Sequence, residues 1–374
     1  MGFIIGILVL LTVMSPYTNI IPAIYMTYMV LFKKTIIYKN HWNIGLCLLF
    51  IWSLIVGVVN YSFMSIALSF IFFIYLCISV FLQNYFQNEN KVEKICRYLV
   101  FFSLLSAIFG IIEKAIHVYF NYNIWAKFLK ITSQPVFNDR IYSTFGNPNV
   151  AGNWFAIMIL LSLYFCSTTS KTTKLFYQIA TFFFVIALYL TGSRGAFMGL
   201  LFGLFTFYLV KGNKKDMWPF ITIFILTAVV TFMPSQILEN VIGHNIWITI
   251  MTSLGIVGMF IYTYMKINLF RNLKILYTHN CRLVPVLAGI QAVIIGHGLV
   301  DFTMISPQTG LLFIASSAII SALVAQYNGL SGNCYEVSAT SQEISEVTDK
   351  IAQSAGILDS SSKEMIEKVS RFKI

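Results

Sequence analysis

The sequence predicts an all-α fold, a polytopic bundle of transmembrane helices, and three observations predict it. Hydrophobic residues make up 58% of the 374 residues. Charged residues make up only 10%, against about 25% in a soluble domain. The mean hydropathy is +0.78, and runs of roughly 20 apolar residues, each long enough to cross a bilayer, recur from Met1 to about Tyr327.

Twelve spans account for these runs. The opening MGFIIGILVLLTVMSPYTN has neither a basic start nor a small-residue cleavage site, so we expect the first span to be retained. The first two spans are short and could together form one re-entrant hairpin. The predicted spans are residues 2–14, 20–32, 42–59, 62–82, 98–118, 150–167, 175–191, 195–211, 217–233, 246–265, 283–302 and 308–327.

Basic residues cluster after every second span. Counted from a cytoplasmic N-terminus, fifteen fall in inside segments and five outside, so the positive-inside rule predicts cytoplasmic termini. The net charge of +11 therefore reports orientation, not a nucleic-acid-binding surface. The inside residues are Lys33, Lys34, Lys39, Lys91, Lys94, Arg97, Lys171, Lys174, Lys211, Lys214, Lys215, Lys266, Arg271, Lys274 and Arg282; the outside ones are Lys114, Lys127, Lys130, Arg140 and Arg194.

The segments between and after the spans have distinct compositions. The longest outside segment, residues 119–150, is rich in aromatic residues, and part of it could lie as an amphipathic helix on the outer leaflet. Residues 330–374 are polar and helix-prone, and we expect a cytoplasmic module separate from the membrane domain of residues 1–329. Apolar residues recur there at the seven-residue spacing of a coiled coil, namely Val337, Ile344, Ile351, Leu358, Met365 and Phe372.

The cysteines indicate no disulfide framework, because none falls in a predicted outside loop. All six lie in apolar segments or in predicted cytoplasmic segments. They are Cys47, Cys77, Cys96, Cys166, Cys281 and Cys334.

Arg194 stands at the predicted outer junction of two spans, in LTGSRGAFMGL. An arginine near the hydrocarbon is costly, so it is rarely placed there without a partner. The glycines and hydroxyls around it, Ser193 included, would allow a tight turn that presents backbone amides beside a guanidinium. That chemistry suits a pyrophosphate or another oxyanion. The alternative is an arginine that reaches lipid phosphate from the membrane surface.

Two further stretches place polar residues where an outer loop becomes a span. In GNPNVAG, Pro148 can start a helix that Asn147 or Asn149 caps. In GHNIW, His244 could relay a proton while Asn245 orients it or a substrate. Each stretch could equally be an ordinary helix cap.

His297 and Asp301, in GHGLVDF, lie four residues apart and so share one face of a helix. A carboxylate within a span usually faces a polar cavity. The pair could instead lock two helices together structurally.

Taken together, FGNPNVAGNWFA, LTGSRGAFMGL and GHNIWITIMTSLGIVG, in this order in a twelve-span chain, resemble the O-antigen ligase/polymerase family of bacterial envelope glycan biosynthesis. The resemblance covers roughly residues 40–325 and is strongest in 145–260. It implies a GT-C-like bundle in the bacterial cytoplasmic membrane and a metal-independent, inverting glycosyltransferase without a cofactor. The donor would be an undecaprenyl-pyrophosphate-linked glycan and the acceptor a hydroxyl of a glycan, lipid or protein.

The resemblance also implies roles for single residues. Arg194 would hold the pyrophosphate and His244 would assist deprotonation of the acceptor or handling of the leaving group. Neutralisation by arginine agrees with the lack of a DxD-like acidic metal motif. The other candidates are Asn147, Asn149, Ser193, Asn245 and Arg140 for substrate binding, with His297 and Asp301 in support.

The chain departs from the family at one place. The family has a long outer loop before the HN motif, whereas here Phe232 reaches His244 through about a dozen residues. The shortened loop predicts weak acceptor positioning. A lipid-linked sugar transporter or flippase, which would also need an outward cationic site, and a non-catalytic truncated family member are therefore alternatives.

The tail has a resemblance of its own. Its last residues, through RFKI, are similar to the C-terminal end of a methyl-accepting chemotaxis protein, of which only the descending helix is present. We therefore expect no chemotactic signalling from it.

Overall fold

The computed structural model describes residues 2–33, 35–120, 140–212, 245–301 and 306–370. Within these ranges the chain forms α-helices and no strand, which confirms the all-α class. Contacts divide it into two compact units, Met1–Val324 and Ala325–Ile374. The boundary predicted after residue 329 falls a few residues beyond this division.

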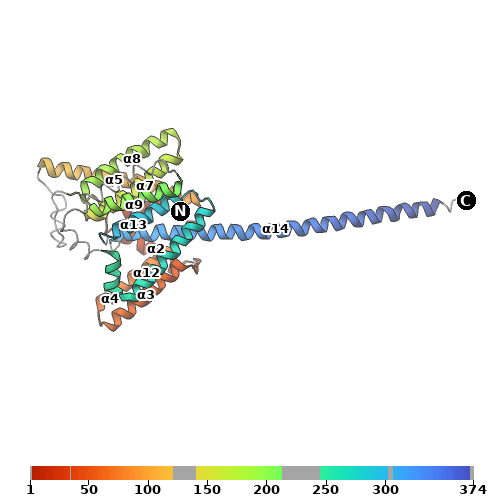
Figure 1. Ribbon diagram of the computed structural model, residues 1–374, viewed down its shortest axis with the longest axis horizontal. Helices are drawn as coiled ribbons and strands as arrows, with labels where there is room; N and C mark the ends of the chain where they lie inside the picture. Colours follow the sequence, from red (N-terminus) through yellow and green to blue (C-terminus); the bar gives the residue numbers. More distant parts are fainter. Residues whose placement is uncertain (1, 34, 121–139, 213–244, 302–305, 371–374) are drawn as a thin grey trace. The chain divides into compact units, whose positions relative to one another are not determined.

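The helices follow the predicted apolar runs, and Figure 1 shows them in chain order by colour. They are α1 (Gly2–Met14), α2 (Ile20–Phe32), α3 (His41–Val59), α4 (Phe63–Tyr85), α5 (Glu89–Phe120), α7 (Pro148–Thr168), α8 (Lys171–Thr191), α9 (Arg194–Lys211), α12 (Ile246–Thr278), α13 (Val284–Gly298) and α14 (Pro307–Ser370).

Eight helical segments in the described part of the chain are long and apolar enough to cross a membrane. The apolar helices α1, α2 and α13 are shorter, and the predicted span 217–233 lies outside the described residues. Large apolar side chains such as Phe63, Phe182 and Phe260 are exposed on the bundle. Exposure of this kind is stable only against lipid, so the helices are those of a multi-pass membrane protein.

Helices α5 and α12 extend well beyond the predicted spans into charged segments. α5 starts at Glu89, not near residue 98, and α12 continues to Thr278, not to 265. Lys266, predicted in an inside loop, consequently lies within α12 and is buried. The expected limits were wrong because a hydropathy run marks the apolar part of a helix, whereas backbone hydrogen bonding continues through charged residues.

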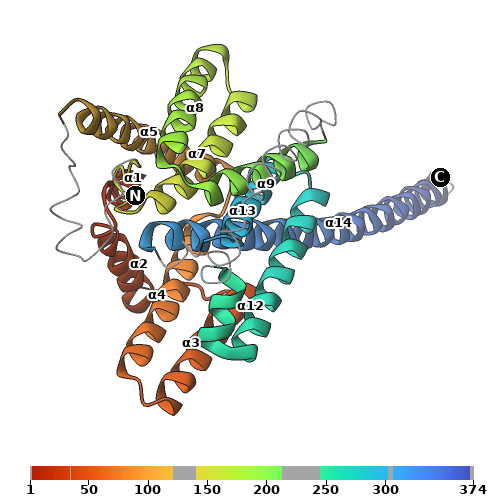
Figure 2. The same ribbon diagram turned by 60° about the vertical axis from the view of Figure 1, so that its left-hand side comes forward.

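Helices α9 and α13 pack closely, side by side in both views of the bundle (Figures 1 and 2). Gly195, Gly199 and Gly203 recur every four residues on α9 and so share one face. A Cβ atom on Gly199 would lie 2.7 Å from the carbonyl oxygen of Val293 on α13. Small residues thus let the two backbones touch, as in other membrane helix pairs.

Helix α7 lies at the centre of the bundle, with nearly all of its residues from Pro148 to Phe165 buried. Pro148 occupies the first turn, and the side chain of Asn147 caps the helix by accepting from the amide of Asn149. A Cβ atom on Gly152 would lie 2.8 Å from the Cβ atom of Ser193. The start of α7 therefore lies directly against the start of α9.

Helix α12 is broken at Gly255, where φ is 67° and ψ is −170°. Only glycine adopts this conformation readily. The indole nitrogen of Trp52 on α3 donates to the carbonyl oxygen of Leu254 at 2.7 Å. The break thus has a side-chain partner for a backbone group that a regular helix would bond internally.

Lys266 lies in a polar network between α12, α13 and α14. Its Nζ atom is 3.2 Å from Oε1 of Gln291, whose amide nitrogen donates to Ser316 Oγ at 2.9 Å. The ammonium also lies 4.2 Å from the centre of the Phe313 ring. Among the described residues these partners are neutral, so the lysine is held by dipoles and an aromatic face.

The second unit, Ala325–Ile374, consists of the last part of α14, which is helical to Ser370. The helix predicted from the seven-residue spacing is therefore present. The last apolar residue of that series, Phe372, lies outside the described residues.

Candidate functional site

Most of the predicted site residues converge at one end of the bundle from segments far apart in sequence. The segment before α7, the start of α7, the α8–α9 turn and the end of α13 meet there. We call the group the arginine cluster. Its members are Arg140, Asn147, Asn149, Ser193, Arg194, His297 and Asp301.

The α8–α9 turn forms as its sequence predicts. Gly192 ends α8 in the left-handed conformation, with φ at 62°, and buried Ser193 caps α9 by accepting from the amide of Ala196 at 3.3 Å. Arg194 is the first residue of α9 and is exposed. Arg194 is thus attached at the positive end of a helix dipole, where an anion is favoured.

Arg140 is held by the protein. Its Nε atom donates to the carbonyl oxygen of Thr191 at 2.6 Å, and its Nη2 atom donates to Oδ1 of Asn149. Burial lowers the pKa of Arg140, and the charge of Asp301 opposes that shift. Arg140 therefore joins the start of α7 to the α8–α9 turn, so its charge is partly committed before any ligand binds.

The two asparagines predicted to bind substrate have structural contacts. Asn147 is exposed, and its side-chain oxygen accepts from the amide of Asn149 at 2.8 Å. The side-chain oxygen of Asn149 accepts from Arg140. In this structure both oxygens therefore hold the start of α7 in place.

His297 and Asp301 lie together, although not within one helix as predicted. α13 ends at Gly298, and a further turn keeps the helical spacing because the amide of Asp301 donates to the carbonyl oxygen of His297 at 2.9 Å. The imidazole Nε2 is 3.9 Å from Oδ2 of Asp301. The ring is fully buried against Gly195, and neither of its nitrogens has a hydrogen-bond partner among the described residues. The pair thus lies directly beneath the first turn of α9.

Asn245 lies next to the arginine cluster, at the end of α13. Its side-chain oxygen caps α12 by accepting from the amide of Trp247 at 2.8 Å, and its Nδ2 atom donates to the carbonyl oxygen of Leu299 at 3.1 Å. His244, predicted to act as a proton carrier, lies outside the described residues. The same holds for the shortened outer loop and for Lys127 and Lys130.

Sequence reasoning missed Glu113, a buried carboxylate on α5. It accepts hydrogen bonds from the backbone amides of Tyr142 and Ser143, two and three residues after Arg140. An acid near the end of an otherwise apolar run was the available signal, because such residues are costly in a span and usually have a function. Its partners could not be read from sequence, since they are backbone groups.

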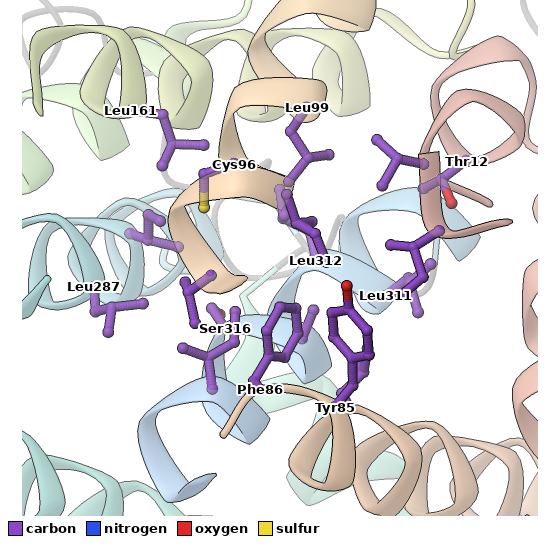
Figure 3. A pocket seen from close by; sticks show the side chains of 18 of the residues that line it. Thr12, Tyr85, Phe86, Cys96, Leu99, Leu161, Leu287, Leu311, Leu312 and Ser316 are labelled. Carbon is purple, nitrogen blue, oxygen red and sulfur yellow. The ribbon is translucent and has the colours of Figure 1, made fainter. Parts of the chain in front are cut away.

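A cavity of about 100 Å³ lies elsewhere in the first unit, and Figure 3 shows side chains converging on it. Its lining is almost entirely apolar, including Leu99, Leu161 and Leu312. The hydroxyls of Thr12 and Ser316 at its wall donate to carbonyl oxygens of their own helices. A lining this apolar, with the hydroxyl of Tyr85 among its few polar groups, is ill suited to a glycan or a pyrophosphate.

Within the described residues, no group of three or more His, Cys, Asp or Glu side chains is placed to hold a metal ion. The chain matches no protein-family model, no curated protein and no solved structure. The chemistry of the arginine cluster is therefore the basis for any functional assignment.

Proposed function

We propose that this protein is a membrane glycosyltransferase of the O-antigen ligase/polymerase type. It transfers glycan from an undecaprenyl-pyrophosphate carrier to an acceptor hydroxyl at the outer face of a bacterial cytoplasmic membrane. The proposal includes a twelve-span, GT-C-like bundle with both termini in the cytoplasm. Its support is the order of the three motifs along the chain and the contacts that two of them make.

The observation that carries the proposal is the difference between the two arginines. Arg140 is engaged by Thr191 and Asn149, whereas Arg194 is exposed on the first turn of α9. A planar guanidinium beside helix N-terminal amides is suited to bidentate binding of a pyrophosphate. Arg194 is thus the ligand-binding arginine, and Arg140 supports the turn that presents it.

The reaction assigns roles in keeping with this geometry. Arg194 stabilises the negative charge that develops on the pyrophosphate leaving group. His244 takes the proton of the acceptor hydroxyl. Because the outer loop is short, the acceptor is poorly positioned. Positioning contributes up to roughly 7–11 kcal/mol in ideal cases, so transfer is slow relative to carrier binding.

The test is binding of undecaprenyl pyrophosphate to the purified full-length protein in nanodiscs. Arg194→Lys should weaken binding at least tenfold, because a point charge does not replace the planar fork. Arg271→Lys, an exposed arginine on α12, is the matched control and should bind as the wild type does. Equal binding by wild type and Arg194→Lys, at equal protein level, would reduce Arg194 to a lipid anchor.

A transporter for lipid-linked sugars is the second candidate, and two observations favour it. The break at Gly255 and the buried Lys266 network are polar or irregular features within spans, as transporters have near the midplane. Transport of a labelled lipid-linked sugar across vesicles, lost in Lys266→Met while carrier binding persists, would favour this candidate. Transfer activity that survives Lys266→Met would favour the enzyme.

A non-catalytic family member is the remaining alternative, and the carrier-binding experiment, combined with a transfer assay, tests it. Arg194-dependent binding of the carrier without transfer to any offered acceptor is its expected result. Transfer that depends on His244, measured with His244→Ala, would reject it.

A further inference from the structure

Glu113 is an acidic residue near the end of the apolar helix α5. It contacts the segment that directly follows Arg140 of the arginine cluster. Its side chain is only 5% exposed. A carboxylate in such a place is expensive unless its charge is compensated by well-placed donors.

Two consecutive backbone amides supply the donors. The amide of Tyr142 lies 3.1 Å from Oε1 and 3.3 Å from Oε2 of Glu113, and the amide of Ser143 lies 2.8 Å from Oε2. Both amides thus point at one carboxylate, and Ser143 itself adopts a left-handed conformation, with φ at 53°. Successive amides in this arrangement form an anion-binding concavity.

The same short segment is fixed at two other points. The amide of Ile141 donates to the carbonyl oxygen of Leu190 at 3.1 Å. The hydroxyl of Ser143 donates to the backbone carbonyl oxygen of Ser106 at 2.6 Å. Arg140 directly precedes these anchors, and its guanidinium reaches Thr191 and Asn149. The direction of the Arg140 side chain is therefore set by how residues 141–143 are held.

We propose that Glu113 is the positioning residue of the arginine cluster. By binding the amides of Tyr142 and Ser143 it keeps Arg140 against the α8–α9 turn, and this contact holds Arg194 in place for an anionic ligand. The role assigned to the ligand rests on the proposed function, whereas the anchoring of residues 140–143 does not.

The carboxylate is needed for a reason that glutamine does not meet. Two carboxylate oxygens accept all three amide contacts, while a glutamine has one oxygen and an NH₂ group that would face an N–H donor. Glu113→Gln can keep only the contacts to Oε2 and places its NH₂ group against the amide of Tyr142 where Oε1 now accepts, so the hold on that amide should weaken. Glu113→Asp keeps both oxygens but shortens the side chain by one methylene, so an intermediate effect is expected.

The first experiment measures backbone amide hydrogen exchange of the full-length protein in nanodiscs. Exchange at Tyr142 and Ser143 should accelerate roughly tenfold in Glu113→Gln and less in Glu113→Asp, with α9 unchanged. Glu93→Gln is the matched control, since Glu93 is on the same helix and accepts from the hydroxyl of Tyr164. Unchanged exchange at these two amides, or equal acceleration throughout α5, α7 and α9, would overturn the proposal.

The second experiment is a double-mutant cycle on the Kd for undecaprenyl pyrophosphate. If Glu113 acts through Arg140, the double variant Glu113→Gln/Arg140→Lys should bind no more weakly than the weaker single variant. Additive losses would overturn the proposal. Faster exchange at Tyr142 and Ser143 in a protein whose wild type binds no carrier would reject the proposed function and leave Glu113 as the anchor. Arg194-dependent binding with no response to Glu113→Gln would support the proposed function and reject the positioning role of Glu113.

Discussion

Replacing Gly199 by alanine should push α9 and α13 apart. The new Cβ atom would lie 2.7 Å from the carbonyl oxygen of Val293 and 3.2 Å from the amide nitrogen of His297. Both neighbours are backbone atoms of α13, so no side-chain rotation relieves the overlap. Ordinary contact begins near 3.4 Å, and the helices must therefore separate by about 0.7 Å.

The size of the effect follows from this displacement. A gap of about 0.5–1 Å forfeits a quarter to a half of the dispersion energy at each contact, and overpacking of a close interface costs about 1–3 kcal/mol. Alanine also gains up to about 1 kcal/mol of helix propensity over glycine. Gly6→Ala on α1 isolates that gain, because its Cβ atom would meet only Tyr98, at 3.9 Å.

The assay is thermal unfolding of the purified variants in the same detergent. Gly199→Ala should melt roughly 2–10 °C below Gly6→Ala. It should also weaken carrier binding, because α9 carries Arg194 and α13 carries His297. Equal melting temperatures for the two variants would refute the idea that backbone contact at Gly199 holds the helices together.

Three further outcomes are expected. A cysteine placed in 121–139 or at exposed Asn147 should react with an impermeant thiol reagent from outside and one in 171–174 should not; outside labelling of Lys214→Cys would contradict the twelve-span topology. A chain ending at Gly329 should insert and bind carrier as the full chain does, and loss of either would show that the tail is integral. Trp52→Phe leaves the carbonyl oxygen of Leu254 without its partner and should lower stability by about 1–3 kcal/mol, seen as a lower melting temperature; an unchanged value would show that this bond contributes nothing.

The positions of the helices followed from hydropathy more accurately than their lengths did. The limits of α1 and α2 agree with the predicted runs 2–14 and 20–32, because polar residues follow both runs and separate them. α5 and α12 continue through charged turns that hydropathy excludes. The break at Gly255 was not foreseen, since apolar composition carries no information on backbone dihedrals.

In the candidate site, too, some features could be predicted from the sequence and others could not. Local chemistry predicted the tight turn at Ser193 and the cap formed by Asn147, because turns and caps depend on residues a few positions away. The anchoring of Arg140 by Glu113 and the contact of Gly195 with His297 join residues far apart in sequence. Such partners are fixed by the packing of α5, α9 and α13, which a single sequence does not specify.

The bond from Trp52 to Leu254 has a consequence for the order in which the protein is built. Trp52 precedes Leu254 by 202 residues, so α3 is synthesised long before α12 leaves the ribosome. In hydrocarbon, a carbonyl without a donor costs several kcal/mol. The bent form of α12 is therefore unfavourable until the indole of Trp52 lies close enough to donate to it. We therefore expect the bend in α12 to form when α12 packs against α3, after insertion into the membrane.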